Sequence, residues 1–146
     1  MLSGTFECSL DNRFRLAIPA KVREYFDDGA AIAWWLDECV VVAPRKDWSS
    51  IVEQTFGQLS VLDPQQRQLR RYLLAGTYEQ DGLDKQGRIV VPEKLRQWAG
   101  IDTKVNVVGA GEYLELWNPA RLDDSFEALR REGVSTLGER LNERGN

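Results

Sequence analysis

The residues of this chain best placed to do chemistry occur twice, each time as an aspartate followed four positions later by an arginine. Asp11 and Arg15 form the first pair and Asp84 and Arg88 form the second, 73 positions further along. An aspartate carboxylate can accept hydrogen bonds from backbone amides two residues ahead and so hold a tight turn. An arginine guanidinium can donate two parallel hydrogen bonds to a phosphate or to a guanine edge. The motif therefore indicates two turns that could present cations to a nucleic acid.

These pairs belong to a longer internal repeat. The second copy carries one additional residue before its aspartate, and after the aspartates the offset of 73 positions is constant. Polar and proline positions that recur at constant spacing indicate a duplication. The matching positions are Asp11 and Asp84, Arg15 and Arg88, Pro19 and Pro92, Lys21 and Lys94, and Arg23 and Arg96.

Each copy predicts the same order of secondary structure. A strand, the aspartate turn and a second, aliphatic strand lead to a proline, which ends strand pairing and suits the first turn of a helix. Two more strands then complete the copy. The first copy is predicted to have strands at 5–10, 15–18, 31–36 and 39–43 and a helix at 19–26; the second has strands at 77–83, 88–91, 104–108 and 113–117 and a helix at 92–99.

Helical periodicity fills the rest of the chain, between the copies and after the second one. A half of about 50 to 70 residues is marginally stable alone, so the two copies are expected to share one core. We therefore predict an α+β fold in which two pseudo-twofold-related, β-rich repeats form one small barrel-like domain. Its expected segments are a first repeat at 1–47, a helical insert at 48–75, a second repeat at 76–119 and C-terminal helices at 120–146.

Composition excludes several classes of protein. The 146 residues include no histidine and only two cysteines, Cys8 and Cys39. Histidine-based catalysis, His-bearing zinc sites and a disulfide framework are therefore excluded. The longest strongly apolar run, residues 30–36, is far shorter than the roughly 20 residues that cross a bilayer, and the N-terminus lacks a signal-peptide pattern. We expect a cytoplasmic protein with no membrane partner, no metal and no cofactor.

The charge distribution matters more than the net charge. A formal net charge of −4 does not by itself suggest binding to nucleic acid. The cations nevertheless gather near the two turns, whereas acidic pairs such as Asp27-Asp28 and Asp123-Asp124 lie outside them. Adjacent carboxylates do not share a helix face and are typical of caps or loop ends, not of an acid/base pair. We therefore predict no catalytic residues, no enzymatic activity and no small-molecule substrate.

Structural interpretations of the same residues compete with binding. An aspartate and an arginine across a tight turn can form a simple ion pair, which contributes about 0–1 kcal/mol when exposed. The pairs Lys21/Arg23 and Lys94/Arg96 are typical of a solvated helix face. Sequence spacing alone does not separate these interpretations from DNA contact.

The two turns resemble those of the swapped-hairpin AbrB-like DNA-binding superfamily. Two copies in a chain of this length, with a helical insert between them, resemble the bacterial MraZ family. The resemblance extends over residues 1–129. The matches that support it are Gly4-Thr5-Phe6, Leu16-Ala17-Ile18-Pro19-Ala20-Lys21, Leu73-Leu74-Ala75-Gly76, Asp84-Lys85-Gln86-Gly87-Arg88-Ile89 and Tyr113-Leu114-Glu115-Leu116-Trp117.

This resemblance implies a sequence-specific, DNA-binding transcriptional regulator of the repressor type. It implies a cytoplasmic, nucleoid-associated protein that assembles into a homo-oligomer, expected to be a ring. The double-stranded DNA would be short repeats upstream of the division and cell-wall gene cluster, which the protein's own gene opens. Carried over by position, the DNA-binding residues are Asn12, Arg13, Arg15, Lys85 and Arg88, and the turn-shaping residues are Asp11, Asp84 and Gly87.

The first copy departs from the family pattern at one position. Phe14 replaces the glycine that the second copy keeps as Gly87. If this position requires a positive φ, phenylalanine costs roughly 1 kcal/mol or more there. The first turn is therefore expected either to differ in shape or to use Phe14 as an apolar contact to a base or a neighbouring subunit.

One alternative from the same superfamily is a protein-binding module such as an antitoxin. Such a module is usually a shorter, single-copy chain that dimerises and has a disordered acidic tail. Residues 122–141 instead keep the apolar spacing of a helix, which counts against this alternative.

Overall fold

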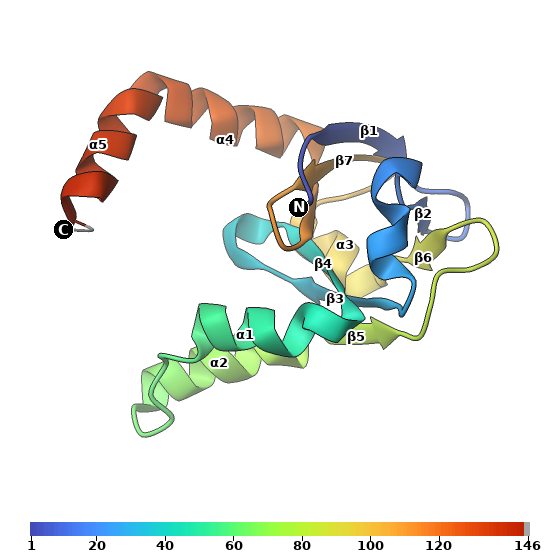
Figure 1. Cartoon of the computed structure of the whole chain (residues 1–146), viewed down its shortest axis with the longest axis horizontal. Coiled ribbons are helices and arrows are strands. Elements are labelled where there is room, and N and C mark those ends of the chain that lie inside the picture. The colour runs from blue at the N-terminus through green and yellow to red at the C-terminus, as the bar shows by residue number, and fades with distance from the viewer. Residues whose placement is uncertain (145–146) are drawn as a thin grey trace.

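Each half of the chain supplies the same series of elements. The first half contains strands β1 (Thr5–Ser9) and β2 (Arg15–Ala17), the 3₁₀ helix η1 (Ala20–Phe26), and strands β3 (Ala30–Trp34) and β4 (Val40–Pro44). The second contains β5 (Thr77–Gln80), β6 (Arg88–Val90), helix α3 (Glu93–Ala99), β7 (Lys104–Gly109) and β8 (Leu114–Trp117). The computed structural model describes residues 1–144 (Figure 1).

The remaining helices connect and follow the two halves. Helices α1 (Trp48–Phe56) and α2 (Pro64–Ala75) lie between them, and α4 (Pro119–Glu132) and α5 (Val134–Arg144) follow the second half. Short 3₁₀ turns η2 (Leu36–Glu38) and η3 (Arg45–Asp47) flank β4. Helices α4 and α5 extend from the sheet as an arm (Figure 1). No helix among residues 1–144 is long and apolar enough to cross a membrane.

The matching helices η1 and α3 differ in type, a distinction that the sequence analysis did not make. Helix α3 ends at Gly100, which adopts the left-handed conformation with φ 66°. Glycine adopts this conformation without a steric cost, which allows the last carbonyls of the helix to be capped. The matching residue after η1 is Asp27, which stays right-handed with φ −58°. The second helix is thus an α-helix with a glycine cap, whereas the first is a 3₁₀ helix without one.

The strands of the two halves exchange partners. β1 pairs with β7 and β5 pairs with β3, so the first strand of each half pairs with the later hairpin of the other half. β4 and β8 pair at the centre, giving the order β1-β7-β8-β4-β3-β5. β2 and β6 form a separate two-stranded ribbon in which Leu16 lies opposite Ile89. These two residues are 73 positions apart, so the pseudo-twofold axis passes between them.

The fold is mixed α+β and contains two repeats, as predicted, but its sheet is open and does not form a closed barrel. β1 and β5 are the two edge strands of the six-stranded sheet. Closing a sheet into a barrel requires its edge strands to pair with each other. Here the chain turns after each edge strand and enters the β2–β6 ribbon, so the two edges never meet.

The core lies on both faces of the sheet. On one face, the ribbon, η1 and α3 enclose a cluster that includes Leu16, Phe26 and Leu95. On the other, α1 and α2 cover a cluster that includes Trp35 and Trp48. Because β3 and β4 are buried on both faces, every residue of β4 is apolar and lacks the alternation of a half-exposed strand.

The buried pair on the pseudo-twofold axis gives a test of this packing. Leu16 is fully buried, and Leu16→Ala should lower the free energy of unfolding by about 2–5 kcal/mol because it removes apolar contacts and leaves a cavity. Val90→Ala on the same ribbon is the matched control; Val90 is 46% exposed, and the loss should stay under about 1 kcal/mol. Urea titrations followed by tryptophan fluorescence, at equal protein concentration, would measure both. Equal losses would contradict the described packing of the ribbon.

Candidate nucleic-acid interface

The two aspartate turns have the same hydrogen-bond pattern. Asp11 accepts from the backbone N–H groups of Arg13 and Arg15 through Oδ1, at 2.9 Å each, and from Arg15 Nε through Oδ2 at 2.7 Å. Asp84 accepts from the backbone of Gln86 and Arg88 at 2.9 Å each, and from Arg88 Nε at 2.8 Å. Each carboxylate therefore holds both the backbone of its turn and the guanidinium of its arginine.

The residue before each arginine adopts a left-handed conformation. Phe14 has φ 59° and Gly87 has φ 75°. The left-handed region costs a non-glycine residue roughly 1–2 kcal/mol because its Cβ approaches the following carbonyl. The first turn therefore keeps the backbone shape of the second despite this cost.

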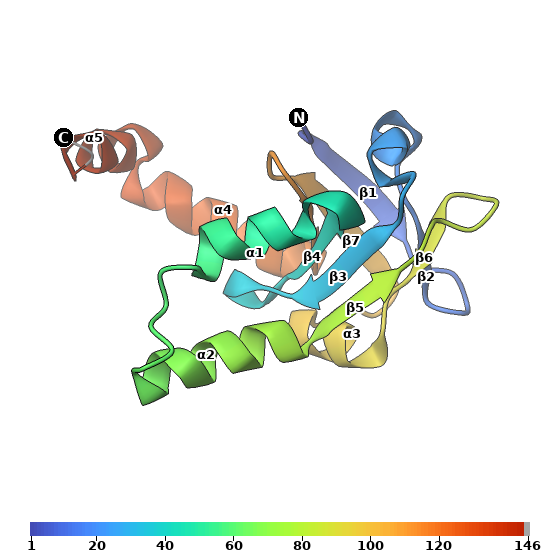
Figure 2. The ribbon, with the colours of Figure 1, turned by 60° about the horizontal axis from the view of Figure 1, so that its bottom comes forward.

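The two turns flank the antiparallel β2–β6 ribbon, one at each of its ends. The Phe14 carbonyl accepts a hydrogen bond from Val91 N, and the Gly87 carbonyl accepts one from Ile18 N, both at 2.9 Å. Arg88 Nη1 also lies 3.4 Å from Asp11 Oδ2, which links the turns directly. We call this surface, residues 11–15 and 84–88, the turn tip (Figure 2).

All eight residues singled out from the sequence lie on this tip. Asn12, Arg13 and Lys85 are exposed, whereas Arg15 and Arg88 have side chains that are only 25% exposed. The two partly buried arginines are held in place by carboxylates, and the three exposed residues belong to the same two turns. This arrangement offers fixed guanidinium groups and flexible cations on one surface, which is the donor set that phosphates and guanine edges accept.

Hydrogen bonding keeps the turn carboxylates ionised. The pKa of Asp11 is lowered to about 2, mainly by the hydrogen bond from the Arg15 backbone N–H. The Arg13 backbone N–H and the Arg15 guanidinium lower it further, although desolvation opposes the shift. The backbone N–H of Arg88 is the main cause of a lowered pKa at Asp84. At neutral pH the tip thus holds two carboxylates against the four cations Arg13, Arg15, Lys85 and Arg88 and stays positive.

The structure corrects the expectation for Arg23 and Arg96. Their spacing in the sequence is typical of a solvated helix face, but Arg23 donates to the Ile18 carbonyl from Nε at 3.1 Å and Nη2 at 2.8 Å. Arg96 donates from Nε to the Val91 carbonyl at 3.0 Å. Each arginine therefore fixes the chain where the ribbon ends, and each reaches the turn of the opposite half. Their shared offset of 73 positions was the only signal of this role in the sequence.

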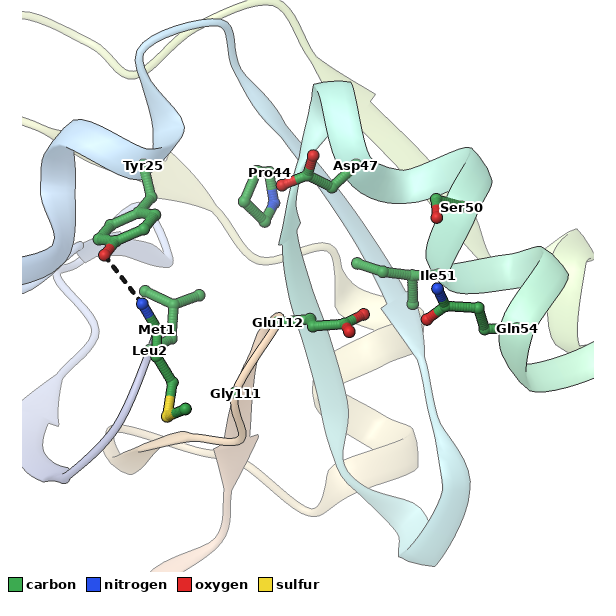
Figure 3. A pocket seen from close by; sticks show the side chains of 10 residues that line it. All are labelled: Met1, Leu2, Tyr25, Pro44, Asp47, Ser50, Ile51, Gln54, Gly111 and Glu112. Atoms are coloured by element: carbon green, nitrogen blue, oxygen red, sulfur yellow. Dashed lines mark hydrogen bonds between the residues drawn. The ribbon is translucent and has the colours of Figure 1, made fainter.

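A separate hollow lies between the N-terminus, the start of α1 and the β7–β8 turn (Figure 3). The Met1 amine donates to the Tyr25 hydroxyl across one side of it at 3.1 Å. Asp47 and Glu112 contribute the carboxylates of its lining, and no lining residue belongs to the turn tip. Its lining sets two carboxylates against the single Met1 ammonium and is therefore acidic, unlike the tip, so we do not include it in the interface.

The buried thiol of the chain is poorly suited to nucleophilic chemistry. Desolvation is the main cause of a raised pKa at Cys39, and the nearby Glu115 carboxylate adds to it. A cysteine is reactive as the thiolate, which this environment disfavours. Among residues 1–144, no three cysteine, aspartate or glutamate side chains are grouped as a metal site would require.

Comparison with known proteins matches the chain to one family. The family model described as "MraZ protein, putative antitoxin-like" matches twice, over residues 1–72 and 73–145. Proteins named "Transcriptional regulator MraZ" from Thermomicrobium roseum and Pediococcus pentosaceus are each 36% identical to it over 97% of this chain, and over 97% and 96% of their own lengths. One from Leuconostoc mesenteroides is 37% identical over 81% of both chains.

The turn carboxylates should make stability depend on acidic pH. The pKa of Asp11 is lower in the folded chain than the usual value near 4, so its contribution is complete above about pH 4 and is lost as the pH falls toward about 2. Asp11→Asn keeps one acceptor oxygen but cannot ionise, so its melting temperature should fall less between pH 5 and pH 2 than that of the unsubstituted protein. Asp28→Asn, in the exposed loop before β3, should keep the unsubstituted pH profile. An unchanged profile in Asp11→Asn would show that the Asp11 bonds do not contribute.

Proposed function

Because the chain belongs to the MraZ family, we propose that it is a transcriptional regulator that binds double-stranded DNA sequence-specifically through the turn tip. The relatives from Thermomicrobium roseum and Pediococcus pentosaceus are named transcriptional regulators, and the proposed role requires binding but no turnover. The observation that carries the DNA-binding proposal is the convergence of both aspartate turns on one surface.

The residues of the tip divide by geometry into two roles. Arg15 is fixed by Asp11 through Nε, which leaves its Nη groups orientated for a guanine or a phosphate. Arg88 is fixed by Asp84 through Nε and by Asp11 through Nη1, which leaves Nη2 for such a contact. Arg13 and Lys85 are exposed cations that suit phosphates. The Asn12 amide can donate to a phosphate or to a base edge. A pseudo-twofold pair of turns also matches the local twofold symmetry of a duplex.

The net charge of −4 does not oppose this function. Docking responds to the local potential, and the tip carries an excess of cations while many acidic residues lie elsewhere. One tip has few contacts, so its affinity alone would be low. An oligomer that presents several tips would gain affinity through avidity, provided that the DNA repeats are spaced to match.

We assign self-association to the arm formed by α4 and α5. Phe126 and Leu129 on α4 are 39% and 40% exposed, and Val134 and Leu141 on α5 are 57% and 66% exposed. Covering this apolar stripe with a second copy of the chain would remove it from water. The homo-oligomeric ring that the family resemblance implies would bring several tips into one assembly.

The biological setting follows from the same resemblance. The protein would act in the cytoplasm on the nucleoid, as a repressor at repeats upstream of the division and cell-wall gene cluster, including its own gene. These targets rest on the family assignment, whereas the mode of binding rests on the tip.

An antitoxin-like, protein-binding role is the second candidate, favoured by the wording of the family description. The exposed apolar stripe on α4 and α5 would then bind a protein of another kind instead of a second copy. In this role the stripe is left for that partner, so placing charges on the stripe should not change the mass of the chain alone.

Binding to DNA from upstream of the protein's own gene should depend steeply on salt. Each phosphate neutralised contributes about −0.9 to the slope of log affinity against log salt. Lys85→Ala should reduce the size of that slope by about one, whereas Lys46→Ala, in η3 and away from the tip, should leave it unchanged. Arg15→Ala and Arg88→Ala should weaken binding further, because each removes both a contact and the partner of a turn carboxylate. Fluorescence anisotropy between 50 and 300 mM salt would measure the slopes, and binding that does not respond to salt would exclude this mechanism.

The mass in solution should be a multiple of the 16.7 kDa chain mass. The double change Phe126→Glu and Leu129→Glu should lower that mass, because it places charges on the stripe that a second copy would cover. Leu69→Glu on α2, where the leucine is 47% exposed, should not lower it. Size-exclusion chromatography with light scattering would give these masses. A monomeric unsubstituted chain would contradict self-association, and an oligomer whose mass the double change does not lower would contradict self-association through the stripe and favour the antitoxin-like role.

A further inference from the structure

The two turns of the tip are equivalent in backbone but not in the side chain at their left-handed position. Phe14 and Gly87 occupy matching places, with φ 59° and 75°. Glycine is the residue that this conformation favours, so a bulky ring here is held against local preference. Residues kept in such conformations cluster at functional sites, where the surrounding structure holds them. The asymmetry therefore identifies the Phe14 ring as a candidate for a specific role.

The ring is presented to solvent by an arginine from the other half of the chain. Phe14 is 41% exposed, and the Arg96 guanidinium carbon lies 3.5 Å from the ring centroid. Arg96 is itself fixed, because its Nε donates to the Val91 carbonyl at 3.0 Å. Val91 N in turn donates to the Phe14 carbonyl at 2.9 Å. One face of the ring is thus covered by a cation, while Phe14 as a whole stays exposed enough to contact a ligand.

The second turn has no such ring. Its matching arginine, Arg23, occupies the space beside Gly87, where an added Cβ would lie 2.3 Å from Arg23 Nε. The same arginine position therefore supports a ring in one turn and fills the place of a side chain in the other. At the constant offset of 73, the pairs Asp11/Asp84, Arg15/Arg88 and Arg23/Arg96 are identical. Three pairs differ, Asn12/Lys85, Arg13/Gln86 and Phe14/Gly87, and only the last of these sets an aromatic ring against a residue without a side chain.

We propose that Phe14 is a base-reading residue whose ring contacts the C5-methyl group of a thymine in the major groove, and that Arg96 is its positioning residue. The inference rests on the proposed function and deepens it. Among the groups that bases present in the major groove, the thymine methyl is the apolar one that an aromatic side chain can contact. Phe14 stands between the exposed cation Arg13 and the fixed guanidinium of Arg15, so phosphate and base contacts on either side would bring the ring to a base edge.

The covered face of the ring argues against insertion between base pairs. A side chain that wedges into a base step must offer apolar surface to the bases it separates. Arg96 occupies one face of the Phe14 ring, so bases cannot stack on both faces of the ring, and the exposed 41% of Phe14 is left for contact. Such contact with a methyl group matches this geometry. The first turn would then contact a thymine methyl group through the Phe14 ring. The second turn has Gly87 at the matching position and could not make this contact.

Replacing thymine by uracil in the bound duplex tests this proposal, because uracil lacks only the methyl group. The probe is a duplex from upstream of the protein's own gene, with each thymine replaced singly by uracil. The unsubstituted protein should show at least one position where uracil weakens binding by about fourfold, the effect of losing one apolar carbon contact. Phe14→Gly should bind the thymine and uracil duplexes equally and should fold, because glycine relaxes the positive φ; thermal unfolding in parallel checks this.

Two arginine variants separate positioning from general damage to the tip. Arg96→Gln removes the guanidinium over the ring and should reduce the thymine preference at the same position. Arg23→Gln is the matched control: it makes the equivalent change beside Gly87, where there is no ring, and should retain the preference even if overall affinity falls. Loss of affinity without loss of the preference in Arg96→Gln would overturn its positioning role.

The remaining outcomes are distinct. Tight, salt-dependent binding by the unsubstituted protein with no uracil-sensitive position, or the same sensitivity in Phe14→Gly, would overturn the role of Phe14 and leave DNA binding by the tip intact. No binding of the unsubstituted protein to the unmodified duplex would instead overturn the proposed function, and this inference with it.

Discussion

Strand exchange between the two halves is the constraint on which the rest of this structure depends. The first strand of each half has its pairing partner in the other half, so neither half can satisfy its backbone hydrogen bonds alone. The same exchange brings β2 and β6 together and places Leu16 against Ile89 in the core. The two turns that follow β1 and β5 are thereby brought to one end of the molecule. A duplicated sequence thus gives one domain and one tip.

The tip is organised before any ligand arrives. Each aspartate binds its turn backbone and its arginine, and Arg88 also reaches Asp11 across the tip. Ordering long arginine side chains in advance lowers the conformational cost of binding, since fewer rotamers are lost on contact. The carboxylates reduce the positive charge, but the exposed Arg13 and Lys85 restore an excess of cations at the rim. Structural ion pairing and DNA contact are therefore compatible roles for the same arginines.

Symmetry in the backbone and asymmetry in the side chains serve different purposes in this arrangement. The matched turns and the ribbon give two similar sets of donors, which suits a duplex. Phe14, held under Arg96, makes the two sets unequal. A surface with unequal halves can distinguish the two ends of a DNA element, which an ideal twofold surface cannot. The arm of α4 and α5 adds apolar area through which several such tips could act together.

The sequence by itself determined the features that depend on short stretches of chain. The aliphatic strands after the aspartate turns, the helical periodicity between and after the two copies, the prolines before η1 and α3, and the turns themselves all depend on residues within a few positions of each other. The constant offset of 73 positions also revealed the duplication and its pseudo-twofold axis. The tertiary structure alone decided that the sheet stays open, that Asp11 meets Arg88, and that Arg23 and Arg96 support the turns. The reason is physical: Phe14 and Arg96 are 82 positions apart, and only strand exchange, which no local pattern encodes, brings such distant residues into contact.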